Sequence, residues 1–292
     1  LSIRRQRQMC IRDRFSNLNE IQTSFRRLIN IVPRNGLLLV NGDESNILSL
    51  SNIEHCPVRR FGLGKECEEQ ADKLLYDENG SNFRIGGTEF RIPMIGELNV
   101  RNALAALLMA RYTGLSDAQI QAGFDSFKGI RRRMEIRGEV NEIIVIDDFA
   151  HHPTAIRETL KALMRRFPGR RIWAIFEPRS NTTRRNHFQK ELADALSLAK
   201  HVLVAEVARL DQVPPEERLN PEQLMEDIRV NGTEAEYLPT ANEIVTYIIP
   251  KTQPGDILCV LSNGGFDNIH QKLLDLSLIH ISEPTRPERI AY

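Results

Sequence analysis

Two aspartates and two histidines follow directly after an apolar run near the middle of the chain. Residues 143–146 are all β-branched, and a short run of this kind is typical of a buried parallel strand. Asp147 and Asp148 come next, then His151 and His152, and a proline that favours the start of a helix. Aspartates at such a strand end can hold ribose hydroxyls or a metal, and histidines can carry protons or bind anions. A helix N-cap aspartate followed by partly buried histidines is the alternative.

Polar residues also follow two other apolar runs. Residues 171–176 are followed by a loop with arginines from Arg179 to Arg185, and arginines can bind carboxylates bidentately. Residues 256–261 are followed by Ser262-Asn263-Gly264-Gly265, whose backbone amides precede a helix and can hold an anion. A glycine turn without a ligand is the alternative for this second loop.

Strands and helices alternate regularly after about residue 130. The apolar patterns predict strands at 142–147, 171–176, 201–206 and 256–261. They predict helices at about 153–166, 184–199, 221–230, 241–249 and 267–275. Such alternation indicates an α/β fold with a doubly wound, mostly parallel sheet, so the three polar loops end on the same edge of one sheet. Convergence of this kind favours a binding site.

The first half of the chain is less regular. We expect a helix within 15–32, a strand at 36–41, a hairpin at 82–93, and helices from about 100 to 111 and from 117 to 127. We place a domain boundary near residue 130.

Asn99 and Asn102 lie three residues apart at the start of a helix. That spacing puts both amides on one face, where they can read an adenine edge or a phosphate; capping and solvation of the helix start is the alternative. Gly62-Leu63-Gly64-Lys65 resembles a phosphate loop only superficially, because the pattern Gly-x-x-x-x-Gly-Lys-Ser/Thr needs other residues at Arg59 and Glu66.

Three consecutive arginines, Arg131 to Arg133, stand at the boundary. They point in different directions on any regular element, so at most one or two can serve a single ligand, and Arg131 is expected to be solvated.

The two ends of the chain do not resemble natural protein sequence. Residues 4–14 and 276–286 resemble translated transposon-type sequencing adapters, so we exclude 1–14 and 276–292 from the fold. Of the 39 basic and 39 acidic residues, this removes seven basic and three acidic, leaving 32 against 36. A mildly acidic protein gives no reason to expect a nucleic-acid partner.

Composition also bears on the compartment. No apolar run approaches the roughly 20 residues of a membrane span. The four cysteines form no Cys-x-x-Cys pair, which favours a reduced, cytoplasmic compartment.

The motifs together resemble the Mur ligase family of ATP-dependent peptidoglycan ligases over residues 15–275. The resemblance rests on motifs in the family's order and spacing: Asn99-x-x-Asn102, Arg132-Arg133, Asp147-Asp148-Phe149-Ala150-His151-His152-Pro153 and Glu177-Pro178-Arg-x-x-Thr. It implies that 15–130 is part of the central ATP-binding domain and that 131–275 is the Rossmann-like C-terminal domain. Residues 179–185 and 262–266 look most like the members that join UDP-N-acetylmuramate to the murein tripeptide L-alanyl-γ-D-glutamyl-meso-diaminopimelate; the members that add L-alanine are near neighbours.

The resemblance implies a mechanism in which ATP phosphorylates the carboxylate of UDP-N-acetylmuramate and the tripeptide's amine attacks the acyl phosphate. By motif, Asn99 and Asn102 contact the nucleotide, Arg133 contacts its phosphates with help from Arg132, and Asp148 contacts the ribose or phosphate region. Arg133 and Asp148 are the predicted catalytic residues. The predicted substrate-binding residues are His151, His152, Arg179, Ser180, Asn181, Thr182, Arg184, Ser262, Asn263 and Gly264.

The sequence also departs from the family. It has no phosphate loop, the ligands for Mg²⁺ are expected before residue 15, and Leu98 stands where many relatives carry His. We therefore expect an N-terminally truncated, monomeric fragment that does not catalyse ligation alone. A non-catalytic α/β module that binds a peptide is the alternative. Folylpolyglutamate-type ligation is disfavoured by the paired histidines, and nicotinamide chemistry by the missing Gly-x-Gly-x-x-Gly.

Overall fold

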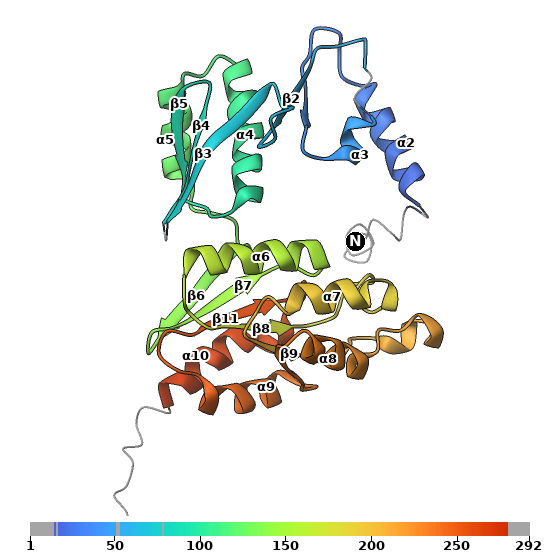
Figure 1. The fold of residues 1–292 in the computed structure, drawn as a ribbon, viewed down its shortest axis with the longest axis vertical. Helices are drawn as coiled ribbons and strands as arrows, with labels where there is room; N and C mark the ends of the chain where they lie inside the picture. The colour runs from blue at the N-terminus through green and yellow to red at the C-terminus, as the bar shows by residue number, and fades with distance from the viewer. Residues whose placement is uncertain (1–14, 16, 51–52, 78, 280–292) are drawn as a thin grey trace, which may run out of the picture. The chain divides into compact units, whose positions relative to one another are not determined.

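The computed structural model describes residues 15, 17–50, 53–77 and 79–279 (Figure 1). Contacts divide the chain into two compact units, which meet in sequence between Gly129 and Ile130 and are described separately. Of the residues predicted to be adapter-derived, 1–14 and 276–292, residues 1–14 and 280–292 lie outside the described residues, and 276–279 form the end of helix α10.

The second unit is built on a six-stranded sheet that is parallel except at one edge. The strand order is β10-β9-β8-β11-β7-β6, and only β6 runs antiparallel to its neighbour β7. The strands in that order are Glu234–Tyr237, His201–Val204, Ile172–Phe176, Ile257–Leu261, Ile143–Asp148 and Glu135–Val140. Every residue of β7, β8, β9 and β11 is buried, because helices cover both faces of a parallel sheet.

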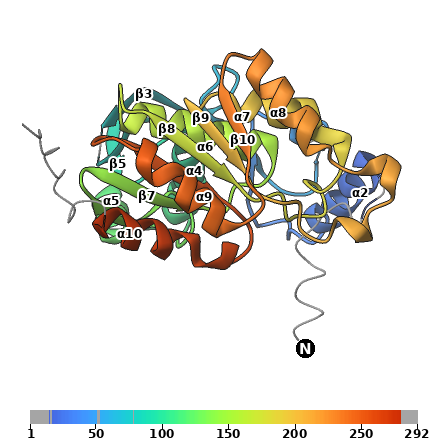
Figure 2. The same cartoon turned by 90° about the horizontal axis from the view of Figure 1, so that it is seen from below.

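Helices cover the two faces of this sheet in two groups. One face packs against α6 (Pro153–Arg166), α7 (Gln189–Leu196) and α8 (Pro221–Val230). The other packs against α9 (Ala241–Ile248) and α10 (Ile269–Ile279), which lie across β7 and β8 in Figure 2. The doubly wound α/β fold is therefore confirmed. Five short 3₁₀ turns interrupt the connections: Asn186–Phe188, Leu210–Gln212, Pro215–Glu217, Ile249–Lys251 and Phe266–Asn268.

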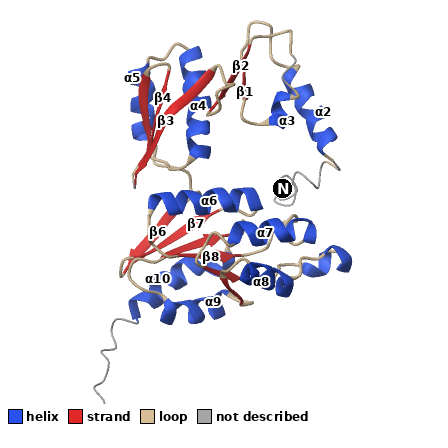
Figure 3. Cartoon of the chain, viewed as in Figure 1, coloured by secondary structure: helices blue, strands red, loops and turns tan. Residues whose placement is uncertain are grey.

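The first unit contains a five-stranded mixed sheet in the order β1-β2-β3-β4-β5. The strands are Leu38–Asn41, Val58–Gly62, Glu69–Asp77, Gly80–Ile85 and Thr88–Ile92. The first three are parallel and the last three antiparallel. Its helices are α2 (Leu18–Ile29), α3 (Ser45–Leu48), α4 (Glu97–Tyr112) and α5 (Asp117–Ser126), and α4 and α5 pack on the β3–β5 hairpins (Figure 3).

In the first unit, strands β2 and β3 and the short helix α3 were not expected from the sequence. In the second unit, three elements differ from the sequence prediction, each for a local reason. Strands β6 and β10 were not expected, because edge strands with alternating charged residues carry no apolar run. The helix expected from residue 184 begins at Gln189, since a loop and a 3₁₀ turn come first.

The Gly62–Lys65 loop holds an internal anion. The carboxylate of Asp43 accepts hydrogen bonds from the backbone N–H of Leu63 (2.9 Å) and Gly64 (2.8 Å) and from Arg101 Nε (2.8 Å). Burial raises the pKa of Asp43, but these donors outweigh it and leave the pKa below its ordinary value. Asp43 thereby joins β1, this loop and α4.

None of the described helices is both long enough and apolar enough to cross a membrane.

The only tryptophan of the chain stacks on a buried histidine. The Trp173 and His201 rings lie 4.0 Å apart at 21°, and His201 Nδ1 lies 3.0 Å from Glu234 Oε2. Burial lowers the pKa of His201, outweighing the nearby Glu234 carboxylate, which raises it.

This pair predicts a pH-dependent stability of the second unit. Above the ordinary pKa of 6.5 the stabilisation is fully present; as pH falls below that value, the unfolded chain binds the proton first and stability is lost toward the folded pKa. Urea unfolding followed by Trp173 fluorescence at about pH 8 and about pH 5.5 measures this loss. His201→Phe, which keeps the stacking without a titrating group, should show a smaller loss, whereas the exposed His187→Asn should behave like the parent. Equal pH dependence in parent and His201→Phe would contradict this prediction.

Candidate functional site

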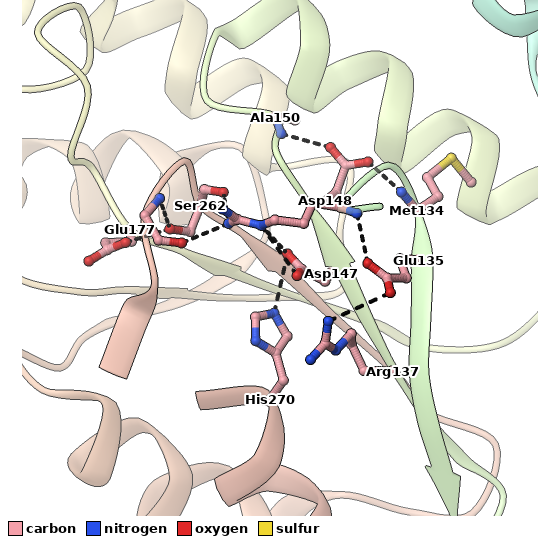
Figure 4. A network of polar contacts seen from close by, with 11 residues as sticks. Met134, Glu135, Arg137, Asp147, Asp148, Ala150, Glu177, Ser262 and His270 are labelled. Atoms are coloured by element: carbon pink, nitrogen blue, oxygen red, sulfur yellow. Dashed lines mark hydrogen bonds and ion pairs between the residues drawn. The ribbon is translucent and has the colours of Figure 1, made fainter. Parts of the chain in front are cut away.

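The carboxylate of Asp148, at the end of β7, accepts three hydrogen bonds, of which those from Met134 and Ala150 are drawn in Figure 4. Its donors are the backbone N–H of Met134 at 2.8 Å, the backbone N–H of Ala150 at 2.7 Å and Thr159 Oγ1 at 3.3 Å. The side chain is buried, and burial raises its pKa despite these donors and the nearby Arg133 charge. Asp148 therefore fixes the loop before β6 and the start of α6 to the end of β7.

Asp147 is buried between two basic side chains. Arg132 Nε lies 3.4 Å from both of its carboxylate oxygens, and Nε2 of the buried His270 on α10 lies 3.4 Å from Oδ1 (Figure 4). Burial raises the pKa of Asp147, but His270 and Arg132 together hold it below its ordinary value. Asp147 is thus an ionised carboxylate in the core of the site.

Phe149 contacts both of the neighbouring arginines Arg132 and Arg133. The Arg132 and Arg133 guanidinium carbons lie 5.3 and 5.4 Å from the centre of its ring, within the range of cation–π attraction. Arg133 is exposed, whereas Arg132 is half-buried. Arg133 is therefore the arginine of this pair that is open to an anion from solvent, and its contact with a phosphate stays a prediction.

The ends of β8 and β11 are joined by a third buried carboxylate, that of Glu177. Glu177 accepts a hydrogen bond from Ser262 Oγ, and Ser262 Oγ accepts one from the Gly264 N–H at 2.9 Å. Arg179 Nη1 lies 3.6 Å from Glu177, and its side chain covers Gly264 so closely that a Cβ there would lie 2.5 Å from Arg179 Cδ. The glycine at 264 allows Arg179 to lie over the turn.

The amide oxygen of Asn263, in the same turn, is buried and has no hydrogen-bond partner among the described residues. Unpaired buried acceptors are costly, and an N–H donor would satisfy this one once the Asn263 side chain turned outward to meet it.

The loop after Arg179 is held by its own side chains. Ser180 and Thr183 are buried and exchange hydrogen bonds between hydroxyls and backbone N–H groups. Arg184 Nη2 donates to Asn181 at 3.2 Å, and its Nη1 donates to the carbonyl of Arg209 at 3.1 Å. Thr182 is half-buried. These contacts order the loop on which Arg179 is carried.

The two histidines after Asp148 make local contacts. His151 Nδ1 lies 2.9 Å from the carbonyl of Phe149. His152 is the N-cap of α6, since its Nδ1 accepts from the Thr154 N–H at 3.3 Å, and its ring packs on Phe188. A capping role at this helix start was one of the two sequence alternatives, although it falls to a histidine rather than an aspartate.

In the first unit, Asn99 and Asn102 lie on the first turns of α4. Asn99 Nδ2 donates to the carbonyl of Ile95 at 2.9 Å, whereas Asn102 is exposed. Contacts of either asparagine with a nucleotide remain predictions.

No group of three or more His, Cys, Asp or Glu side chains in the described part of the chain is placed to hold a metal ion. The basic groups fit an anion better: Arg133 and Arg179 are exposed side chains held beside strand ends.

Comparison with known proteins gives the family of this architecture. The model of the Mur ligase middle domain matches residues 12–110, and the model of the Mur ligase glutamate ligase domain matches residues 132–264. The chain belongs to the Mur ligase family.

Two kinds of curated relative resemble this Mur ligase chain about equally. It is 35% identical over 267 residues to the Escherichia coli UDP-N-acetylmuramate–L-alanyl-γ-D-glutamyl-meso-2,6-diaminoheptandioate ligase, covering 90% of the chain and 56% of the relative. It is 32% identical over 281 residues to the Acetivibrio thermocellus UDP-N-acetylmuramate–L-alanine ligase, covering 92% and 59%. The chain thus spans a little over half the length of these relatives.

Solved structures agree with the fold. A murein peptide ligase from Psychrobacter arcticus matches with 31% identity and a TM-score of 0.64, covering 89% of the chain and 55% of that protein. The Thermotoga maritima UDP-N-acetylmuramate–alanine ligase matches with 20% identity and a TM-score of 0.74, covering 94% and 58%, which supports the fold alone.

Several residues at this sheet edge were not predicted in the roles that the structure gives them. Phe149 and Glu177 stood inside recognised motifs without an assigned role, and Asp147 was considered only as a possible ribose or metal ligand. His270 gave no signal, since a single histidine within an amphipathic helix does not indicate a contact with a strand end far away in the sequence. The inward orientation of Arg132 was also not expected.

Replacing Asp148 with Asn should destabilise the second unit by about 1–3 kcal/mol, because an amide NH₂ group would face one of its two backbone N–H donors. Urea unfolding followed by Trp173 fluorescence measures the change, with the exposed Asp211→Asn as a control expected to stay near the parent. A change below about 0.5 kcal/mol in Asp148→Asn would show that these bonds do not hold the site.

Proposed function

We propose that this chain is part of an ATP-dependent ligase that joins UDP-N-acetylmuramate to the tripeptide L-alanyl-γ-D-glutamyl-meso-diaminopimelate in peptidoglycan recycling. The observation that carries the proposal is the exposed Arg179 held over the Ser262–Gly264 turn, beside the buried and unpaired amide oxygen of Asn263. An arginine suits a carboxylate and an amide oxygen suits an N–H donor, and the tripeptide offers both. A cytoplasmic location and a monomeric state are parts of this proposal.

Bound ATP with Mg²⁺ would supply the phosphoryl group that activates the carboxylate of UDP-N-acetylmuramate. By the resemblance to the family, the exposed Arg133 is assigned to the phosphates of the nucleotide, and the exposed Asn102 with Asn99 is assigned to its base. Asp148 is held inward by backbone donors, so its part is to fix the loop that carries Arg133. His151 and His152 border the same strand end and would help to orient the acceptor.

Acceptor binding falls to the loops after β8 and β11. Arg179 would pair with an acceptor carboxylate, with Ser180, Asn181, Thr182 and Arg184 maintaining the loop around it. Ser262 and Gly264 hold the turn that presents Asn263. An acceptor with several carboxylates uses an arginine-rich loop better than L-alanine does.

L-alanine is the second candidate acceptor, because identity to the Acetivibrio thermocellus L-alanine ligase is nearly as high as to the Escherichia coli tripeptide ligase. Both candidates share the nucleotide chemistry and differ only in the acceptor.

A chimera decides between the two acceptors. Residues 15–275 replace the matching segment of the Escherichia coli tripeptide ligase, and ADP release is measured with ATP, UDP-N-acetylmuramate and either acceptor. We expect kcat/KM for the tripeptide to exceed that for L-alanine by about 100-fold or more, since several charged contacts distinguish them. A preference for L-alanine would establish the second candidate, and the unmodified Escherichia coli enzyme is the control. A folded chimera that binds ATP but is inactive with both acceptors would contradict ligation altogether.

The chain by itself should not release ADP above background with both substrates present, because its sequence lacks the phosphate-loop pattern. ATP-dependent ADP release by the chain alone, abolished in Arg133→Ala, would contradict this expectation.

A further inference from the structure

Arg132 connects three segments of the second unit. Its Nη2 donates to the carbonyl of Ser262 at 2.6 Å and to that of Gly264 at 2.7 Å, while its Nε faces Asp147. The guanidinium thus joins the loop before β6, the end of β7 and the turn after β11.

The two carbonyls belong to a turn that is also bonded through Ser262, whose N–H donates to the Asp148 carbonyl at 3.1 Å and whose Oγ donates to Glu177. Arg132 adds the contacts to the carbonyl oxygens of Ser262 and Gly264. Ser262 and Gly264 are alternate residues whose carbonyl oxygens meet at one nitrogen, which can donate one hydrogen to each. A planar guanidinium can do this and still face a carboxylate with Nε; an ammonium group on a lysine cannot reproduce that geometry.

Arg132 is itself fixed from both sides. Its backbone lies in the left-handed region with φ 59°, its N–H donates to Glu135 at 2.8 Å, and its carbonyl accepts from the Phe149 N–H at 2.8 Å. Asp147 anchors the guanidinium, and His270 lies on the other side of that carboxylate. A side chain held this firmly is better suited to fixing the position of the segments that it contacts than to binding a ligand from solvent.

We propose that Arg132 is a positioning residue that sets the Ser262–Gly264 turn for the acceptor, with the Asp147–His270 pair as its anchor. Arg133 and Arg132 then divide between two tasks, the first facing the nucleotide and the second holding the acceptor turn. The kinetic part of this inference rests on the proposed function, and the structural part does not.

The kinetic test uses Arg132→Lys in the active chimera. The charge beside Asp147 is kept while the paired carbonyl contacts are lost, so KM for the acceptor should rise by about tenfold and KM for ATP should change by less than about twofold. A rise in KM for ATP with unchanged acceptor KM would overturn the inference and make Arg132 a nucleotide contact. The exposed neighbour Arg131→Lys is the matched control, with neither constant expected to move.

His270 provides a second variant that leaves Arg132 in place. His270→Leu should raise the acceptor KM in the same direction, and His270→Gln, which keeps a polar N–H group near Asp147, should recover most of the loss. Equal effects of Leu and Gln would show that only packing at this position matters and would remove the anchor from the proposal.

Hydrogen exchange tests, without catalysis, whether Arg132 holds the Ser262–Gly264 turn in place. In the 292-residue chain itself, Arg132→Lys should speed exchange of backbone amides in residues 262–266 by about tenfold, while amides of α7 stay protected as in the parent. Unchanged exchange at 262–266 would show that Arg132 does not hold this turn, even if the chimera is active. An inactive parent chimera with faster exchange in the variant would contradict the proposed function alone.

Discussion

The structure of the site depends on two adjacent buried carboxylates at the end of β7. A buried carboxylate is costly unless charged or hydrogen-bonded groups compensate it, and Asp147 and Asp148 are compensated in different ways. Asp148 accepts hydrogen bonds from the backbone of the loop before β6, from the backbone of Ala150 in the loop after β7, and from the Thr159 hydroxyl on α6. The Asp147 carboxylate lies beside the side chains of Arg132 and His270. Because these partners come from segments scattered along the second unit, satisfying the carboxylates brings those segments to one sheet edge.

Other carboxylates with internal hydrogen-bond partners also order loops elsewhere in the chain. Glu177 ties the end of β8 to the turn after β11 through Ser262, and Asp43 fills the Gly62–Lys65 loop in the first unit. In each case an internal anion orders a loop that follows a strand. The basic side chains left exposed beside these loops, Arg133 and Arg179, are then held at defined positions and can meet anionic ligands.

Much of the fold could be predicted from apolar periodicity, and some of the site could not. Buried strands such as β7 and β11 can be recognised in the sequence as continuous β-branched or aliphatic runs. The edge strands β6 and β10 contain charged residues and no such run, so the sequence pattern does not predict them. From the motif spacing we predicted that Asp148, Arg179 and Asn263 lie at the same edge of the sheet. The spacing could not show which arginine of a pair points inward, or that His270 reaches Asp147, because both depend on tertiary packing of α10 against the sheet.

A double-mutant cycle between Asp147 and Arg132 tests this account most directly. Asp147→Asn, Arg132→Gln and the double variant are unfolded in urea, with Trp173 fluorescence reporting the second unit. The account predicts a coupling free energy of about 1–3 kcal/mol, because each single variant leaves the other charge without its partner in a largely buried setting. Additive effects, with a coupling below about 0.5 kcal/mol, would contradict the claim that this pair organises the site.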